Sequence, residues 1–160
     1  LRNNLQNNKV LIFSQFKEML HLIAQACRKE QMAYYHFDGD TAIEDRLKMV
    51  NEFQQEDNAV NIFLMSLKTG NAGLNLTAAD YVFLVDPWWN SAIQQQAIDR
   101  THRIGQTKNV FAYKMICKNT IEEKIIEMQL RKQTVSDSII TEDENFVKNL
   151  SQEDINYLFA

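Results

Sequence analysis

The sequence contains little cysteine, proline or glycine, and it has no long apolar run. Among its 160 residues are two cysteines, one proline and four glycines. Cys27 and Cys117 are too few, and too ordinary in context, for a disulfide scaffold or a zinc site, so both are predicted to be buried thiols. No apolar run approaches the roughly 20 residues of a membrane helix, and residues 1–8 lack the pattern of a signal peptide. We therefore expect a soluble, intracellular protein with no membrane partner.

The length and composition fit one domain with one core. A chain of this size buries roughly 70% of the surface that its unfolded form exposes. The hydrophobic share of 45% and the charged share of 24% are ordinary for a globular protein. The net charge of −4 argues against a protein that grips nucleic acid with its whole surface, so any such contact is expected to be local.

Apolar runs and helical periodicity alternate along the chain. Short apolar runs, typical of strands covered on both faces, are interrupted by stretches with apolar residues three and four apart, which indicate helices. Such alternation predicts an α/β fold with a mostly parallel central sheet flanked by helices. In such sheets ligands bind beyond the carboxyl ends of the strands. The predicted strands are 9–14, 33–37, 60–66, 81–85 and 110–116, and the clearest helices are 16–27, 43–53 and 121–132.

Two loops after predicted strands have unusual compositions. The stretch SLKTGNAGLNL, residues 66–76, contains glycines and asparagines that let backbone amides approach phosphate oxygens, but it is also explained as a tight turn. Neither a phosphate loop ending in Gly-Lys-Ser/Thr nor the pattern GxGxxG is present. In DPWWN, residues 86–90, Trp88 is expected in the core, whereas Trp89 either joins it or offers a flat face to a base or sugar.

Acidic residues and histidines do not form a metal-binding pattern. The segment DGD at 38–40 lacks the further ligands of a calcium loop, and its acids suit a turn and a helix start. His21 and His36 have no second ligand at metal spacing. We predict no metal site in this chain.

The segment DRTHRIGQ, residues 99–106, carries two arginines three residues apart near the end of a predicted helix. At that spacing Arg100 and Arg103 project from one helical face, with Gln96 one turn earlier. A surface ion-pair role needs acidic partners, and Asp99 is only one. The alternative is that the two guanidinium groups face phosphate oxygens, for which arginine is better suited than lysine. A second molecule or domain must then supply the phosphate.

The C-terminal stretch from about residue 135 is acidic and partly helical. Ser151 suits an N-cap with Asp154 at the third helical position, and Ile155, Leu158 and Phe159 give an apolar face. We expect residues 1–8 to be a linker, 9–134 to form the domain, and 135–160 to be a helical extension packing on it.

The motifs VLIFSQF, DGDT, SLKTGNAGLNLTAAD, DPWWN and QQQAIDRTHRIGQ follow one another in an order that resembles the second RecA-like lobe of the Swi/Snf-type ATPases. This family is a branch of helicase superfamily two, and the resemblance runs from about residue 9 to 132. It implies a RecA-like, three-layer domain of the P-loop NTPase type. The wording of SLK and DPWWN is closer to bacterial members, which implies a cytoplasmic, nucleoid-associated setting rather than a nuclear one.

In this family two lobes clasp ATP between them. The resemblance implies that the N-terminal lobe of the same polypeptide binds most of the ATP and Mg²⁺, and that this lobe supplies Arg100 and Arg103 as catalytic arginine fingers. The chain alone is then expected to hydrolyse no ATP, and the full-length protein to be a DNA-dependent ATPase that moves along double-stranded DNA. A DNA-bound protein is a further expected partner.

The resemblance also implies roles for individual positions. It assigns ATP binding and coupling to Gly73, Asn75, Gln96 and Asp99. It assigns contact with the DNA backbone, without sequence preference, to Ser14, Gln15, Lys68, Thr69, Gly70 and Trp89.

The sequence departs from the family at two places. Thr69, Gly70 and Asn71 stand where Ala-Gly-Gly is usual, and Ser91 stands where proline is common. Two alternative functions remain: a degenerate clamp that holds DNA or protein without turnover, and an RNA helicase lobe. RNA helicases usually end the arginine motif in Gly-Arg, whereas here it ends in Gly105-Gln106.

Overall fold

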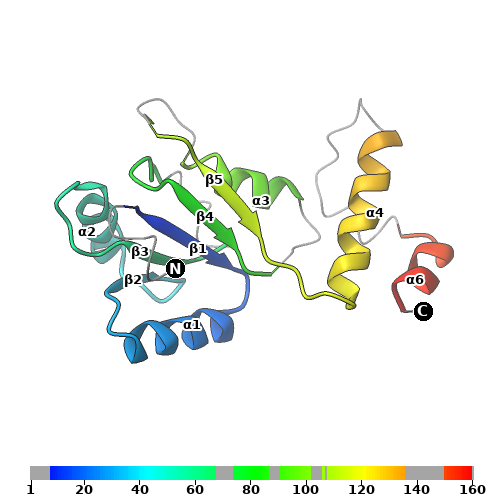
Figure 1. Ribbon diagram of the computed structural model, residues 1–160, viewed down its shortest axis with the longest axis horizontal. Coiled ribbons are helices and arrows are strands. Elements are labelled where there is room, and N and C mark those ends of the chain that lie inside the picture. Colours follow the sequence, from blue (N-terminus) through cyan, green and yellow to red (C-terminus); the bar gives the residue numbers. More distant parts are fainter. Residues whose placement is uncertain are drawn as a thin grey trace.

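Five parallel strands form one sheet, with helices on both of its faces (Figure 1). The computed structural model describes residues 8–67, 74–86, 91–101, 106, 108–135 and 150–159. The strands are β1 (Val10–Ser14), β2 (Tyr34–Phe37), β3 (Ile62–Ser66), β4 (Tyr81–Leu84) and β5 (Phe111–Lys114). The helices are α1 (Lys17–Lys29), α2 (Ile43–Gln54), α3 (Ser91–Ile98), α4 (Ile121–Val135) and α6 (Gln152–Phe159).

The strand order across the sheet is β2-β3-β1-β4-β5, and every neighbouring pair is parallel. The central strand β1 pairs with β3 on one side and with β4 on the other. The predicted α/β architecture and all five predicted strands are therefore confirmed, each within two residues at either end. Parallel pairing requires a crossover between consecutive strands, and α1, α2 and α3 provide such crossovers.

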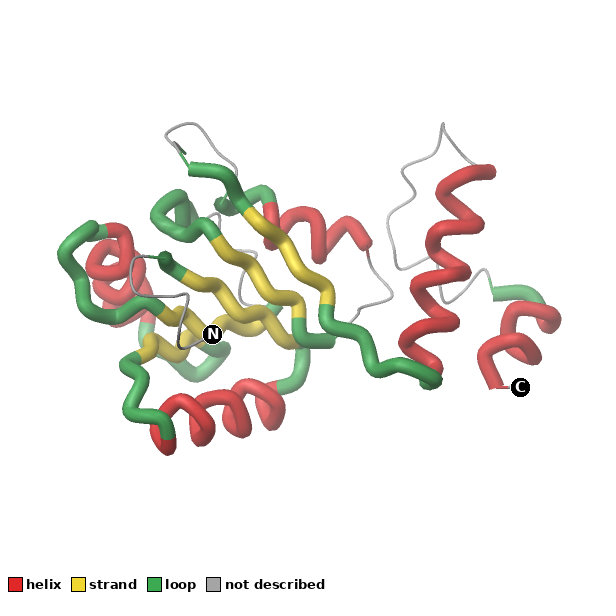
Figure 2. The backbone as a smooth tube through the Cα atoms, viewed as in Figure 1, coloured by secondary structure: helices red, strands yellow, loops and turns green. Residues whose placement is uncertain are grey.

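The sheet is covered on both faces, and its central strands β1 and β3 are accordingly apolar at every position except the last, Ser14 and Ser66. On β1, Leu11 and Phe13 belong to the core shared with α2 and α3, whereas Val10 and Ile12 belong to the core shared with α1. Figure 2 shows the resulting three layers. A run of consecutive apolar residues is therefore what the central strand of such a sheet requires.

A buried lysine joins the start of β1 to the end of α2. The Lys9 ammonium donates to the carbonyl oxygen of Phe53 at 2.5 Å and also to that of Gln55, and it lies 5.2 Å from the centre of the Phe53 ring. Burial lowers the pKa of this ammonium, and the nearby Lys108 acts in the same direction. The contact caps the carbonyl end of α2, where a cation is favourable.

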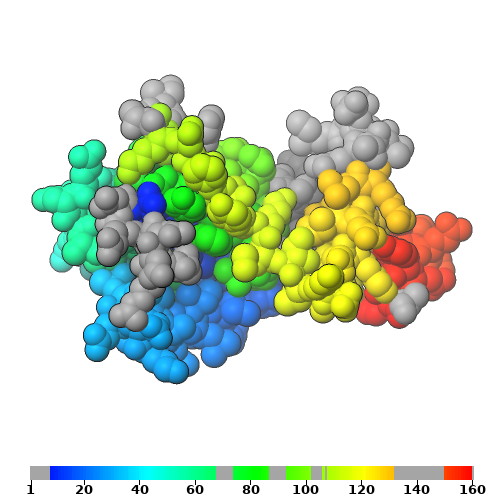
Figure 3. Space-filling view, in the orientation of Figure 1, coloured from blue at the N-terminus to red at the C-terminus, as the bar shows by residue number. Residues whose placement is uncertain are grey.

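The two C-terminal helices contact each other at one end of the molecule (Figure 3). Ile125 and Met128 of α4 form a small apolar cluster with Leu158 of α6. The predicted cap of the last helix is confirmed: the Ser151 hydroxyl accepts from the Asp154 amide at 3.1 Å, and the Asp154 carboxylate accepts from the Ser151 amide at 2.9 Å. The domain limits 1–8, 9–134 and 135–160 stay predictions.

The edge strand β5 differs from the other strands because all four of its residues are exposed. Phe111 and Tyr113 stack on aromatic rings of β4 at 5.4 and 5.2 Å between centroids. Cys117 follows this strand and is exposed, so the prediction of two buried thiols is correct for Cys27 and wrong for Cys117. Among the described residues, no helix combines the length and apolar content that crossing a membrane requires.

Candidate functional site

Three neighbouring strands end at the same edge of the sheet, where the sequence predicts ligand contacts. Backbone hydrogen bonds continue beyond the strand ends: the Leu67 amide donates to the Ser14 carbonyl at 2.9 Å, and the Val85 amide donates to the Phe13 carbonyl at 3.0 Å. Leu67, which follows β3, and Val85, which follows β4, are therefore both hydrogen-bonded to the end of β1.

Asp86 is a buried carboxylate beside the end of β1. It accepts from the Gln15 amide at 3.0 Å and from the Ser14 hydroxyl at 3.1 Å, and it is only 6% exposed. Burial raises the pKa of this carboxyl, and the hydrogen bonds from Gln15 and Ser14 partly oppose the increase. Sequence reasoning did not single out this residue, although an acidic residue directly after a buried strand was the available signal.

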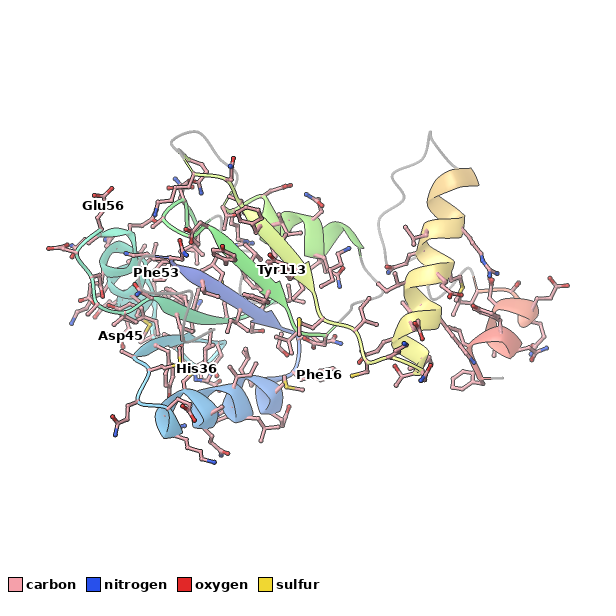
Figure 4. All side chains as sticks on the ribbon, viewed as in Figure 1. Phe16, His36, Asp45, Phe53, Glu56 and Tyr113 are labelled. Carbon is pink, nitrogen blue, oxygen red and sulfur yellow. The ribbon has the colours of Figure 1, made fainter. Side chains whose placement is uncertain are left out.

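The structure places the two predicted DNA-contacting residues of β1 differently. The Ser14 side chain is buried, and its hydroxyl also accepts from the Phe16 amide at 3.0 Å. Gln15 is half-buried, and Phe16 beside it is exposed (Figure 4). The buried hydroxyl of Ser14 thus shapes the turn into α1, and DNA contact by either residue stays a prediction.

Several predicted site residues lie outside the described residues. They are Lys68, Thr69, Gly70, Gly73, Trp89 and Arg103. Their assignments to DNA, coupling or catalysis stay predictions.

A turn at residues 75–78 connects α2 to the arginine segment. The Gln54 side chain donates to the Asn75 carbonyl at 3.2 Å and accepts from the Ala78 amide at 2.8 Å. Within the same turn, the backbone amide of Leu76 donates to the Arg100 carbonyl at 3.2 Å. Asn75 and Arg100, both predicted from the family, therefore belong to one hydrogen-bonded region.

Arg100 lies inside the lobe rather than on its surface. Helix α3 ends at Ile98, two residues before it, and Arg100 is only 3% exposed. Gln96 and Asp99 are exposed, and the Asp99 carboxylate accepts from the Gln95 side chain at 2.9 Å. The described structure thus brings Gln96, Asp99 and Arg100 to the carboxyl end of α3 with different solvent access.

Gln106, the last residue of the arginine motif, links Thr101, which follows α3, to Ala79, which precedes β4. Its side-chain nitrogen donates to the carbonyls of Ala79 and Thr101, each at 3.0 Å, and its oxygen accepts from the Lys108 amide at 2.9 Å. Both ends of the amide are used, which explains why a carboxamide suits this position.

His21 of α1 packs against His36 of β2, the edge strand at the other side of the sheet from β5. Their rings are 5.4 Å apart and nearly perpendicular. Burial lowers the pKa of His36. In the described part of the chain, no three histidine, cysteine or acidic residues gather as metal ligands would.

Comparisons with known proteins agree with the motif order. Residues 1–105 match the family described as helicase conserved C-terminal domain. The chain is 40% identical over 151 residues to an ATP-dependent helicase of Mycoplasma genitalium, covering 94% of the chain and 14% of that protein. It is 39% identical over 160 residues to the DNA repair protein rad8 of Schizosaccharomyces pombe, covering 99% of the chain and again 14% of the relative.

A third relative and one solved structure extend this result. The DNA repair protein RAD5B of Arabidopsis thaliana is 43% identical over 151 residues, which are 94% of the chain and 12% of the relative. The crystal structure of the C-terminal part of the Fun30 ATPase domain superposes with a TM-score of 0.74 at 32% identity, covering 94% of this chain and 45% of that one. The chain thus spans between 12% and 14% of the length of these three relatives. It belongs to the helicase conserved C-terminal domain family and has the sequence and fold of the second RecA-like lobe of Swi/Snf-type ATPases.

Proposed function

We propose that the full-length protein is an ATP-dependent translocase or remodeller that moves along double-stranded DNA, and that this lobe supplies arginine fingers to ATP held by an N-terminal lobe. The observation that carries the proposal is the Leu76 to Arg100 backbone hydrogen bond. The bond joins two segments. Leu76 lies in the segment that follows the predicted DNA-contacting loop, and Arg100 lies in the segment that carries the predicted arginine fingers. In the proposal, this contact links a movement of one segment to a movement of the other.

The chemistry of the available groups fits this division between two lobes. The sequence contains no Gly-Lys-Ser/Thr phosphate loop, and the described residues hold no acidic cluster suited to Mg²⁺. Arginine and carboxamide side chains are donors suited to phosphate oxygens. In the proposal, the N-terminal lobe binds ATP and Mg²⁺, while Arg100 and Arg103 stabilise the charge that develops on the transferred phosphoryl group.

Arginine fingers of this kind raise turnover by about 10³- to 10⁵-fold. Because the N-terminal lobe holds the nucleotide, the lobe alone is proposed to be inactive. Contacts with DNA are proposed to be made to sugar and phosphate, so that turnover depends on duplex DNA but not on its sequence. The proposed setting is the cytoplasm, in association with the nucleoid, with a DNA-bound protein as a further partner.

The decisive experiment measures ATP hydrolysis by the full-length protein with and without duplex DNA. The wild type is compared with Arg103→Ala and with the control Arg28→Ala, which removes an exposed arginine of α1. We expect DNA to stimulate the wild type and the control, whereas Arg103→Ala binds ATP and DNA but turns over orders of magnitude more slowly.

Each other result has a definite meaning. Unchanged turnover in Arg103→Ala would refute the arginine-finger role. Equal or stronger stimulation by RNA would instead favour an RNA helicase. Binding of DNA without any turnover by the wild type would favour a clamp.

Arg100 requires a second readout because it is buried. Removing a buried arginine is expected to lower thermal stability as well as turnover, since its neighbours lose a packed and charged partner. Thermal denaturation of Arg100→Ala beside Arg100→Lys therefore separates a packing effect from an effect on phosphate.

A further inference from the structure

Two buried carboxylates flank strand β4, one at each end. Asp80 precedes the strand and Asp86 follows it at an interval of two residues, and each is 6% exposed. Each accepts a backbone amide from the chain beside β1: Asp80 from Lys9 at 2.8 Å, and Asp86 from Gln15 at 3.0 Å. The pair fastens β4 to β1 beyond both ends of their ladder.

The two carboxylates differ in what they hold. At the amino edge, the Lys9 carbonyl also accepts from the amides of Asp80 and Tyr81, so that contact is a local extension of the sheet. At the carboxyl edge, Asp86 accepts from the Ser14 hydroxyl, which in turn accepts from the Phe16 amide at 3.0 Å. Asp86 therefore fixes the backbone where the chain turns from β1 into α1.

Joining two strands through a buried carboxylate carries a large desolvation penalty. Placing a charge out of water is unfavourable unless hydrogen bonds compensate, and burial raises the pKa of Asp86. Apolar side chains of similar size fasten strands at lower cost. What the carboxylate adds is direction, because its Oδ2 atom accepts from two successive residues of one loop, the Ser14 hydroxyl and the Gln15 amide. The Gln15 amide also lies 3.3 Å from the Oδ1 atom of the same carboxylate.

We propose that Asp86 is a positioning residue for DNA engagement: it holds the turn from β1 into α1, residues 14–16, in a fixed relation to the end of β4, so that this turn meets DNA in one conformation. This inference rests on the proposed function. Asp86 itself touches no DNA in this scheme. It acts through the backbone of Gln15 and Phe16 and through the hydroxyl of Ser14.

The test uses the full-length protein and a matched pair of substitutions. Asp86→Ala removes both acceptor oxygens, Asp86→Asn keeps one of them, and Asp80→Asn is the control at the other end of the same strand. Hydrogen bonds to a charged group are strong enough that we expect Asp86→Ala to raise the DNA concentration for half-maximal ATPase stimulation about tenfold. The maximal stimulated rate is expected to change much less.

Two further results are expected if Asp86 has this role. Asp86→Asn shows a smaller increase than Asp86→Ala, because one acceptor remains. Amide hydrogen exchange at Gln15 and Phe16 accelerates in the Asp86 variants and stays at the wild-type rate in Asp80→Asn. If Asp86→Ala does not fold, Asp86→Asn and Ser14→Ala carry the same comparison, and their effects are less than additive in the double variant.

The outcomes separate this inference from the proposed function. A wild type that DNA does not stimulate refutes the proposed function, and the role of Asp86 in DNA engagement falls with it. A stimulated wild type whose half-saturation by DNA is unchanged in Asp86→Ala overturns the positioning role alone. Equal changes in Asp86→Asn and Asp80→Asn also overturn it, because they would reflect general loss of sheet stability.

Discussion

Replacing Lys9 by methionine removes an ammonium while keeping most of its apolar stem. The wild-type ammonium donates to two carbonyls at the end of α2 and lies over the ring of Phe53, which Figure 4 labels on that helix. Hydrogen bonds to charged groups contribute about 1.5–3 kcal/mol each, and a partly desolvated cation over an aromatic ring contributes about 1 kcal/mol. The burial that lowers the pKa of Lys9 offsets part of this gain.

The net expectation for Lys9→Met is a free energy of unfolding lower by about 2–4 kcal/mol. In a chain of this size that corresponds to a melting temperature lower by about 4–16 °C. Urea denaturation and thermal melting of the protein measure both quantities. Lys48→Met is the control, because Lys48 is an exposed lysine of α2 whose nearest carboxylate, that of Glu52, is 4.0 Å away; its expected change is below about 0.5 kcal/mol.

A Lys9→Met variant whose free energy of unfolding lies within about 0.5 kcal/mol of the wild type would refute the stabilising role of the ammonium. Water would then replace the ammonium at the carbonyls of α2 without penalty. A large effect in Lys48→Met would point instead to the charge of the helix as a whole.

Three further predictions concern other buried groups. Because burial lowers the pKa of His36 in the folded state, the unfolded chain binds a proton at this side chain more readily than the folded chain does. The free energy of unfolding should therefore fall as the pH drops through about 6.5, and the fall should be smaller in His36→Phe. Denaturation measured at a series of pH values tests this. Asp38 opposes this effect, whereas His21 and Arg28 add to it. Phe63→Ala removes a ring with three aromatic neighbours within 6.3 Å and should lower the free energy of unfolding by about 3–5 kcal/mol; a loss below about 1 kcal/mol would contradict the packing. The Gln94 side chain is 0% exposed, and its amide has no hydrogen-bond partner in the described part of the chain. Gln94→Met should therefore raise the free energy of unfolding, measured by urea denaturation, by about 1–2 kcal/mol. A lower free energy of unfolding in this variant would show that the amide is needed.

Local patterns in the sequence predicted the elements of this fold well. The run from Val10 to Phe13 is apolar because both faces of β1 are covered, and that can be read from composition alone. The cap at Ser151 and Asp154 involves residues three apart, so it was also visible. The order of the strands was not, since it depends on pairing between distant segments.

The candidate site shows the same division. The arginine motif was recognised from its spacing, but Arg100 lies beyond the end of α3 at Ile98 and is buried, and no local pattern reports either fact. Asp86 was missed because its partner Ser14 lies 72 residues away. Cys117 was placed in the core because cysteine usually lies there, whereas the chain at that point has just left an exposed edge strand.

That edge strand has a practical consequence for handling the lobe on its own. Phe111 and Tyr113 of β5 are 47% and 45% exposed, and Met115 beyond them is 51% exposed. β5 also ends the sheet, so in the described structure no further strand pairs with its outer edge. A free edge with exposed aromatic side chains is a template for strand addition between molecules. The apparent mass of the purified lobe, measured by light scattering, is therefore expected to rise with concentration, and Tyr113→Lys is expected to suppress that rise.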